Sequence, residues 1–315
     1  MNRFELALEN DRWLNLGDFV KFCVDHENQD IIIDVVNEGH CLQYCGVYDI
    51  LEKFNFSSVS IITSNALEYH PTYCINNKNW IYWLTAIENF NFNFDYSWNR
   101  SKLFGCFYGR PSAARLGIAS YLLKHHHDKS FLITKFNFTN EESRKHFDLK
   151  KLFTWDLDSS KNLFLLENLV LDNETEYIKG KYDQSNSLSK HYKNILIDIV
   201  SEPSCAGNAF YPTEKIARAI LCRRPFIVMG NKNYLLYLRQ MGFLTFWEFW
   251  DEDYDGFDQN LRYLKILKLI DNIAMLNQQK IQDLFYGLIP LLEHNFNLLK
   301  TQTYQTNITR IIDDY

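Results

Sequence analysis

The sequence predicts an α/β fold made of two Rossmann-like domains with a cleft between them. A chain of 315 residues is long enough for two domains of ordinary size. Short apolar runs rich in β-branched residues alternate with helical segments, which is the pattern of parallel βαβ units. The pattern stops in an irregular stretch at residues 91–98 and then begins again. We therefore expect an N-terminal domain at 1–98, a second domain at 99–270 and a C-terminal helical segment at 271–315.

Composition and charge restrict the class of protein. Apolar residues make up 46% and charged residues 23%, so the chain can bury a core. The net charge of −6 argues against a protein that works by gripping nucleic-acid phosphates. Residues 1–13 lack the apolar region of a signal peptide, and no apolar run approaches the length of a membrane span. These features, with seven cysteines that show no repeated metal spacing, predict a cytoplasmic protein with reduced thiols.

The N-terminal elements begin with a β-branched run at residues 30–36, which predicts a buried strand that ends in a turn. Apolar residues at helical spacing predict a helix over 41–54, and a second β-branched run predicts a strand at 58–63. The segment 80–90 is apolar enough to form a largely buried helix. Strand, helix and strand in this order indicate a parallel unit.

The second half repeats this alternation, while residues 136–193 are too polar and irregular to assign. Pro111 and Ser112 suit the first positions of a helix. The alternation predicts strands at 102–108, 130–134, 195–200 and 224–230, and helices at 113–125, 213–221, 233–241 and over most of 257–300. In such sheets ligands bind beyond the carboxyl ends of the strands.

One predicted helix start in this half has residues that suit the binding of a phosphate group. Thr213 is a plausible N-cap, and Glu214 and Lys215 follow it in the first turn. Free backbone N–H groups at a helix start attract an anion, and a lysine beside them adds a mobile positive charge for phosphate. Glu214 would accept hydrogen bonds from ribose hydroxyls. The alternative is an ordinary capped surface helix with a solvated Glu–Lys pair.

The same segment, Thr213-Glu-Lys followed by a helix and by Arg224-Pro-Phe-Ile-Val-Met-Gly230, resembles the donor-binding segment of the α-1,3-fucosyltransferases. The continuation at 233–255 looks more like uncharacterised glycosyltransferase-like proteins of bacteriophages and bacteria. A second stretch, from Phe104 to about Leu122, resembles the strand, turn and helix that open the donor domain of those enzymes. The resemblance covers about residues 100–256 and implies the two-domain GT-B fold.

The resemblance also implies roles for individual residues. Arg115, or Arg110 in the turn, and Lys215 would neutralise the donor diphosphate, while Glu214 would hold the ribose. The rest of the expected donor-binding set packs around the nucleotide and the helix start, and consists of Glu202, Tyr211 and Thr213. As in other GT-B enzymes, the segment 271–315 is expected to pack back on the N-terminal domain.

An inverting transferase needs a general base for the acceptor hydroxyl. We expect it at the carboxyl ends of the N-terminal strands, where Glu38 is the first candidate, His40 the second and Glu68 the third. For each of them an ordinary loop residue is the alternative.

No metal site is expected. CxxxC at Cys41 and Cys45, with His40 beside it, is a weak zinc pattern. The remaining patterns that resemble metal motifs are better explained as solvated loop acids and a solvated helix end; they are Asp156/Asp158, Asp251/Asp253 and His125–His127.

The leading hypothesis is a metal-independent glycosyltransferase without a cofactor, inverting in outcome, that uses a GDP- or UDP-sugar as donor. Its acceptor would be a glycan, a lipid-linked glycan or a protein. Two alternatives stay open. One is a transferase that acts on modified bases of DNA. A basic surface around Arg110, Arg115 and Lys124 would support this alternative. The other is an inactive transferase fold that serves as a binding module.

Overall fold

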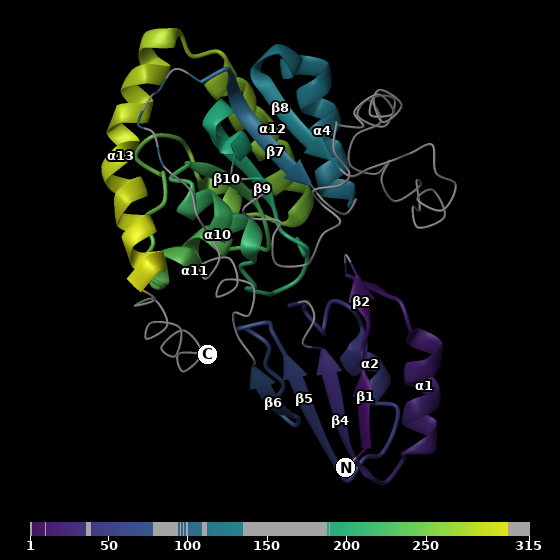
Figure 1. Cartoon of the computed structure of the whole chain (residues 1–315). Helices are drawn as coiled ribbons and strands as arrows, with labels where there is room; N and C mark the ends of the chain where they lie inside the picture. The colour runs from purple at the N-terminus through teal and green to yellow at the C-terminus, as the bar shows by residue number, and fades with distance from the viewer. Residues whose placement is uncertain are drawn as a thin grey trace.

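The chain forms two four-stranded parallel sheets, each accompanied by helices (Figure 1). The computed structural model describes residues 2–9, 11–35, 39–77, 94, 96, 98, 100–108, 112–134, 188 and 190–301. The two parallel sheets with their helices confirm the predicted mixed α/β class.

The N-terminal sheet has the strand order β1-β4-β5-β6, and all three pairings are parallel. Alternate side chains of its central strands are buried, because one face packs on helices. The short antiparallel pair β2–β3 leads from β1 into α1. The elements of this N-terminal unit are β1 (Asn2–Glu5), β2 (Leu8–Glu9), β3 (Arg12–Trp13), α1 (Leu16–Asp25), β4 (Asp30–Val35), α2 (Val47–Leu51), β5 (Ser58–Thr63) and β6 (Cys74–Asn77).

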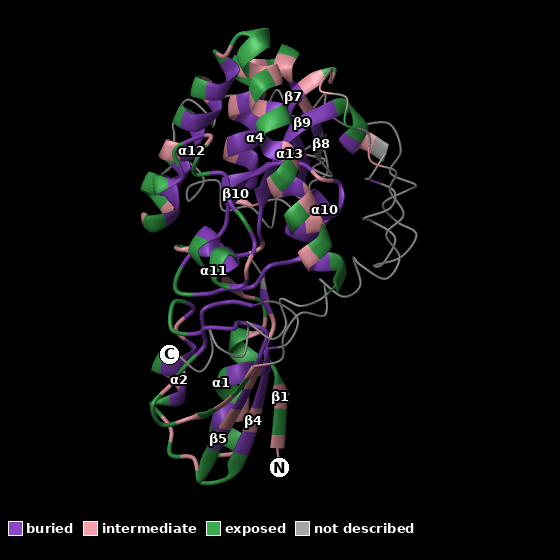
Figure 2. Cartoon of the chain, turned by 90° about the vertical axis from the view of Figure 1, so that its left-hand side faces the viewer, coloured by how far each residue is buried: buried purple, intermediate pink, exposed green. Residues whose placement is uncertain are grey.

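The second sheet has the order β10-β9-β7-β8, again with parallel pairings. Its central strand β9 is buried along its whole length, as expected of a parallel strand covered on both faces. In Figure 2 the buried colour runs through this sheet, while exposed residues lie on the outer sides of its helices. The elements of this second unit are β7 (Lys102–Tyr108), α4 (Ala113–His126), β8 (Ser130–Thr134), β9 (Ile195–Ser201), α10 (Glu214–Leu221), β10 (Phe226–Met229), α11 (Tyr234–Gln240), α12 (Gln259–Ala274) and α13 (Gln278–Thr301).

Each sheet has a hydrophobic core of its own. The core of the N-terminal unit is drawn from residues 6–61, whereas that of the second unit is drawn mainly from residues 103–299. Ala66 and Leu67 are the exception, because they follow β5 in the chain and yet pack into the second core.

The C-terminal helix α13 belongs to the second unit. Its buried side chains, Phe285, Leu288, Leu292 and Leu299, join the second core, and the helix packs against α10. This differs from the expectation that residues 271–315 pack back on the N-terminal domain. An apolar stripe along α13 covers α10 instead, and residues 302–315 lie outside the described part of the chain.

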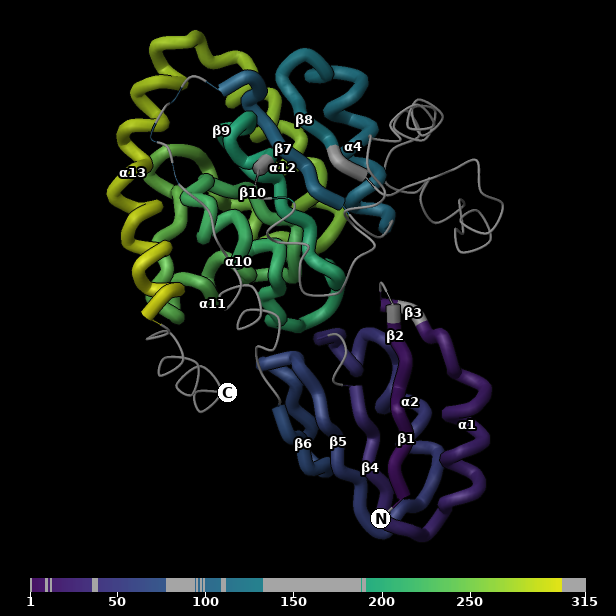
Figure 3. The backbone as a smooth tube through the Cα atoms, viewed as in Figure 1, coloured from purple at the N-terminus to yellow at the C-terminus, as the bar shows by residue number. Residues whose placement is uncertain are grey.

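The two units contact each other through segments that follow strand ends. Asn65, just after β5, donates from Nδ2 to the carbonyl of Asn208 at 3.2 Å and accepts from the N–H of Phe210 at 2.9 Å. The N–H of Ala66 donates to the carbonyl of Phe210 at 3.1 Å. In Figure 3 the segment after β5 and the segment after β9 meet between the two sheets. The carboxyl ends of β5 and β9 therefore face a common junction.

The predicted strands and helices of the second unit agree with the structure to within a few residues. In the N-terminal unit, the helix expected over 41–54 is shorter and begins only at Val47, because Gly46 takes a left-handed conformation with φ +73°. The strand β1 and the helix α1 were not predicted. The helix expected at 80–90 lies outside the described residues. None of the described helices is long and apolar enough to span a membrane.

Candidate functional site

Two helices start beyond the ends of neighbouring strands at the carboxyl edge of the second sheet. Helix α4 follows β7 and helix α10 follows β9, and these two strands are neighbours in the sheet. Ser112 caps α4 by accepting from the N–H of Arg115 at 3.3 Å, and Thr213 caps α10 by accepting from the N–H of Lys215 at 3.3 Å. Helix starts carry partial positive charge. The edge of this sheet is therefore suited to an anion.

Lys215 lies in the first turn of α10, as the sequence predicts. Its Nζ donates to Glu214 Oε1 at 2.9 Å and to Thr213 Oγ1 at 3.2 Å. Burial opposes ionisation of Glu214, but the charge and hydrogen bond of Lys215 outweigh it and lower the pKa of Glu214 to about 2. The pair is partly exposed, with 16% of the Lys215 side chain and 24% of the Glu214 side chain accessible. Glu214 is thus ionised, and both side chains are within reach of a ligand.

The Glu202 carboxylate positions the start of α10 and is not available to bind a ligand. Its carboxylate accepts from the Thr213 N–H at 3.2 Å, from Thr213 Oγ1 at 2.6 Å and from the Tyr234 hydroxyl at 2.5 Å. Burial raises the pKa of Glu202, against the effect of Lys215 and of these donors. Glu202 fixes the position of Thr213 and so of the N-terminus of α10.

Arg115 lies at the expected edge but is deeply buried. Its Nε and Nη2 donate to the carbonyl of Ser201, at 3.3 and 2.9 Å. Only 3% of the residue is exposed. Arg115 therefore ties the first turn of α4 to the end of β9, and a contact with a diphosphate stays a prediction.

The loop between β9 and α10 is held in place by side chains of later elements. Asn231 Nδ2 donates to the carbonyl of Ala206 at 2.7 Å. The buried Arg262 donates to the carbonyl of Cys205 at 3.2 Å and also to that of Gly230. A loop fixed in this way is a preformed platform at the sheet edge.

Tyr211, expected near the nucleotide, lies at the junction of the two units. It is buried and packs directly on Gly39, where an added Cβ would come 2.3 Å from the Tyr211 Cβ. Glycine is needed at position 39 for this close approach. The segment after β4 therefore lies beside the loop that leads to α10.

Two of the predicted site residues, Glu38 and Arg110, lie outside the described residues. The third candidate base, Glu68, is buried and accepts three hydrogen bonds, from the Leu42 N–H at 3.1 Å, the Tyr48 hydroxyl at 2.7 Å and Asn65 Nδ2 at 2.9 Å. Burial raises the pKa of Glu68, while these donors oppose the shift. Its bonding favours a structural role at the junction.

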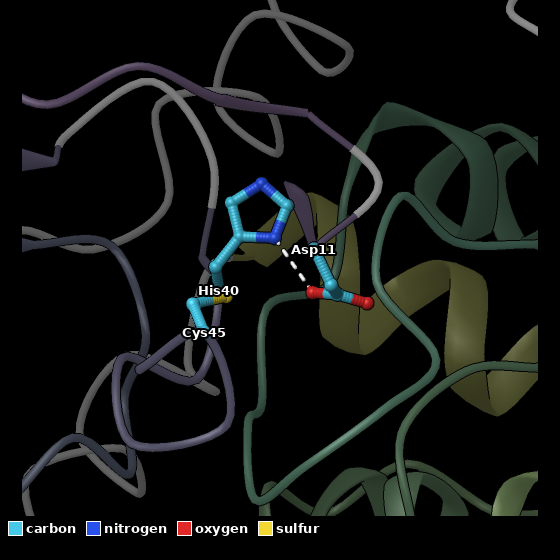
Figure 4. Close-up of side chains that lie close together, drawn as sticks. All are labelled: Asp11, His40 and Cys45. Carbon is cyan, nitrogen blue, oxygen red and sulfur yellow. Dashed lines mark hydrogen bonds and ion pairs between the residues drawn. The ribbon is translucent and has the colours of Figure 1, made fainter. Parts of the chain in front are cut away.

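His40 is brought together with Asp11, a residue that the sequence analysis does not single out. His40 Nδ1 lies 2.7 Å from Asp11 Oδ1, and Cys45 completes a compact group with them (Figure 4). His40 is 1% exposed, and burial raises the pKa of Cys45 strongly, with the charge of Asp11 as the next cause. The contact joins residues 29 positions apart in sequence, so no local pattern could reveal it.

The other sequence patterns considered for metal binding behave as expected where they are described. Asp251 and Asp253 are exposed, and Asp253 pairs with Lys265 at 2.6 Å. His125 and His127 are exposed at the end of α4, while His126 contacts Asp271 at 2.7 Å. Asp156 and Asp158 fall outside the described ranges.

Comparisons with known proteins give no family for this chain: no protein-family model and no curated protein matches it.

Proposed function

We propose that the protein is a glycosyltransferase of the two-domain GT-B type that binds a nucleotide-diphosphate sugar at the carboxyl edge of the second sheet. The observation that carries the proposal is that capped helices start beyond the ends of the neighbouring strands β7 and β9, with the partly exposed Lys215 in the first turn of α10. This is the position at which open parallel sheets bind nucleotides. The resemblance of residues 100–256 to fucosyltransferase donor domains points to the same place.

The proposed reaction needs positive charge where the diphosphate leaves. As the bond between the sugar and the diphosphate breaks, negative charge grows on the phosphate oxygens. Lys215 and the N-terminal end of α10 would stabilise that charge. The Ser201 hydroxyl at the end of β9 is buried and has no hydrogen-bond partner among the described residues, so it offers one further polar contact at this edge.

The acceptor side of the proposed site is the N-terminal unit. The cleft would lie where the segments after β4 and β5 approach the loop after β9, and Gly39 and Asn65 already contact that loop. The acceptor hydroxyl would lose its proton to a base as it attacks the sugar. Since Glu68 is held by three donors, the base is proposed to come from the segment after β4, which contains Glu38 and His40.

A thermal-shift experiment with the full chain tests the donor site. The probes are UDP, GDP, CDP and dTDP, because a ligand that binds the folded state raises its melting temperature. The matched pair of variants is Lys215→Ala and Lys268→Ala, since Lys268 is exposed on α12 away from the sheet edge. We expect a shift with one nucleotide that is lost in Lys215→Ala and kept in Lys268→Ala. The absence of any shift, or an equal shift in both variants, would overturn the proposal.

A further inference from the structure

The group formed by Asp11, His40 and Cys45 lies outside the proposed donor site and has the composition of a metal site. A carboxylate oxygen, an imidazole nitrogen and a thiol sulfur from these residues lie within 4.8 Å of one another. It is the only such group of three or more metal-binding side chains within the described ranges. Figure 4 shows the His40 ring and the Asp11 carboxylate facing each other, with Cys45 alongside.

The backbone holds the three residues together. Asp11 lies in the turn between β2 and β3 and has φ +60°, a left-handed conformation that costs energy for a residue other than glycine. Trp13, two residues later, donates from Nε1 to the carbonyl of Cys45 at 2.7 Å. This bond fixes the β2–β3 turn against the 41–46 turn. The strained position thus places a carboxylate beside His40.

The neighbouring cysteine has a different environment. An added Cβ on Gly207 would lie 2.9 Å from the Cys41 Sγ, so the Cys41 side chain faces the second unit. Cys41 is not a member of the group, although it precedes Cys45 by one turn. Cys45 is thus the cysteine of the CxxxC pattern that joins the group, and Asp11 takes the place of the ligand that the sequence pattern lacks.

We propose that Asp11, His40 and Cys45 bind a divalent transition-metal ion of the zinc class. Zinc accepts oxygen, nitrogen and sulfur ligands at about 2.0–2.3 Å. Around a tetrahedral ion the ligand atoms lie about 3.3–3.8 Å apart. The oxygen and nitrogen ligands take the short end of this range, so the 2.7 Å contact between Asp11 and His40 would open by about 0.6 Å as the ion enters.

The proposed site balances its charges. The ion displaces the thiol proton of Cys45 to solvent, and the neutral His40 ring coordinates through Nδ1 and carries its proton on Nε2. One carboxylate and one thiolate then neutralise the two positive charges of the ion. Neutrality matters because the site is buried, with 1% of His40 and 10% of the Asp11 side chain exposed. Three protein ligands leave a fourth position for water or another group.

The proposed ion would have two consequences. It would link the β2–β3 turn to the 41–46 turn next to the junction, where Cys41 packs on Gly207 of the second unit. It would also occupy His40 Nδ1, so His40 could not act as a base oriented by Asp11. The base in the proposed transfer reaction would then be Glu38.

Metal binding is tested on the full chain after treatment with a chelator and a reductant. The probes are Zn²⁺, measured by competition with a coloured chelator, and Co²⁺, whose bond to a thiolate gives a charge-transfer absorption in the near ultraviolet. The thiolate signal separates this site from the exposed histidines at the end of α4. We expect one Zn²⁺ per chain and a cobalt–thiolate band.

Near-isosteric variants assign the ligands. Cys45→Ser and Asp11→Asn should weaken zinc binding by more than about a hundredfold, a larger loss than that of a residue beyond the ligands. Asn tolerates the left-handed conformation at position 11, so this variant keeps the turn. Cys41→Ser is the matched control and should bind as the parent does.

Several results would overturn the proposal. They are the absence of stoichiometric Zn²⁺ in the parent protein, zinc affinity unchanged in Cys45→Ser, or a cobalt–thiolate band lost in Cys41→Ser but kept in Cys45→Ser. Circular dichroism of each variant confirms that it is folded. The proposal does not depend on the donor site, because nucleotide binding at Lys215 is measured separately.

Discussion

Asn65 and Phe210 are joined across the two units, with the Phe210 N–H donating to Asn65 Oδ1 at 2.9 Å. The same amide donates from Nδ2 to Asn208 and to Glu68. One side chain thus connects the end of β5, the loop after β9 and a buried carboxylate. Polar contact at the junction thus accompanies the packing of Ala66 and Leu67 into the core of the second unit.

Replacement of Asn65 by alanine should destabilise the protein. It removes the five hydrogen bonds of this side chain, with Phe210, Leu67, Asn208, Glu68 and His40, and leaves buried partners unpaired, which costs about 2 kcal/mol. Urea unfolding of Asn65→Ala measures the loss. Asn297→Ala, at an exposed position on α13, is the control and should change the free energy of unfolding by less than about 0.5 kcal/mol. Equal stability of the two variants would show that the junction does not depend on Asn65.

Gly39→Ala should also destabilise the junction. The added methyl group would lie 2.3 Å from the Tyr211 Cβ, so one of the two segments must move. Overpacking of this kind costs about 1–3 kcal/mol. At Gly17 an added Cβ meets no atom within 4 Å, so Gly17→Ala should be neutral or stabilising. The difference between the melting temperatures of the two variants checks the prediction, and a stable Gly39→Ala protein would contradict it.

Arg115 and Lys215 should behave differently although both are cations at the same edge. Arg115→Met removes both bonds to the Ser201 carbonyl and should lower the free energy of unfolding by about 2 kcal/mol without any ligand. Lys124→Met, at an exposed position on the same helix, is its control. Lys215→Ala removes the partly exposed pair with Glu214, so it should cost less stability than Arg115→Met, and it should weaken nucleotide binding at least about tenfold, or about 1.4 kcal/mol. The reverse pattern would show that the roles of the two residues are exchanged.

Stability should depend on pH through Asp198. This carboxylate is buried in β9, where it accepts from the Tyr192 hydroxyl. Burial raises its pKa to about 6 from an ordinary value of 3.8, although Arg218 and Tyr192 oppose the shift. The folded protein therefore keeps the Asp198 proton in a range where the unfolded chain releases it. The contribution of Asp198 to the free energy of unfolding should fall as pH rises through this range, by up to about 3 kcal/mol.

A comparison with Asp198→Asn isolates this contribution, because asparagine does not titrate. The difference between the free energies of unfolding of the parent and the variant, measured from about pH 3.5 to 7, should decrease with rising pH. A difference that stays constant, or that increases with pH, would contradict the raised pKa of Asp198.

Local patterns were sufficient to predict most of the second unit. The β-branched run at 195–200 and the capped helix after Thr213 both appear where the sequence places them. A buried parallel strand is a continuous apolar run, and a helix start is marked by its cap. Both features can therefore be predicted from residues that are neighbours in the sequence. Strand β1 escaped prediction because its alternation of half-buried and exposed side chains in Asn2–Glu5 is too short to be distinctive.

The sequence by itself determined the α/β class, the strands of the second sheet that end beside α4 and α10, and the presence of Thr213, Glu214 and Lys215 at a helix start. Tertiary structure alone decided that Arg115 donates hydrogen bonds to the Ser201 carbonyl. It also decided that Glu202 and Glu68 are structural acceptors and that α13 packs on the second unit. It alone also brought Asp11 to His40. The physical reason is that caps and periodicity act over a few residues, whereas a buried polar side chain is satisfied by whichever donor or acceptor the folded chain brings to it.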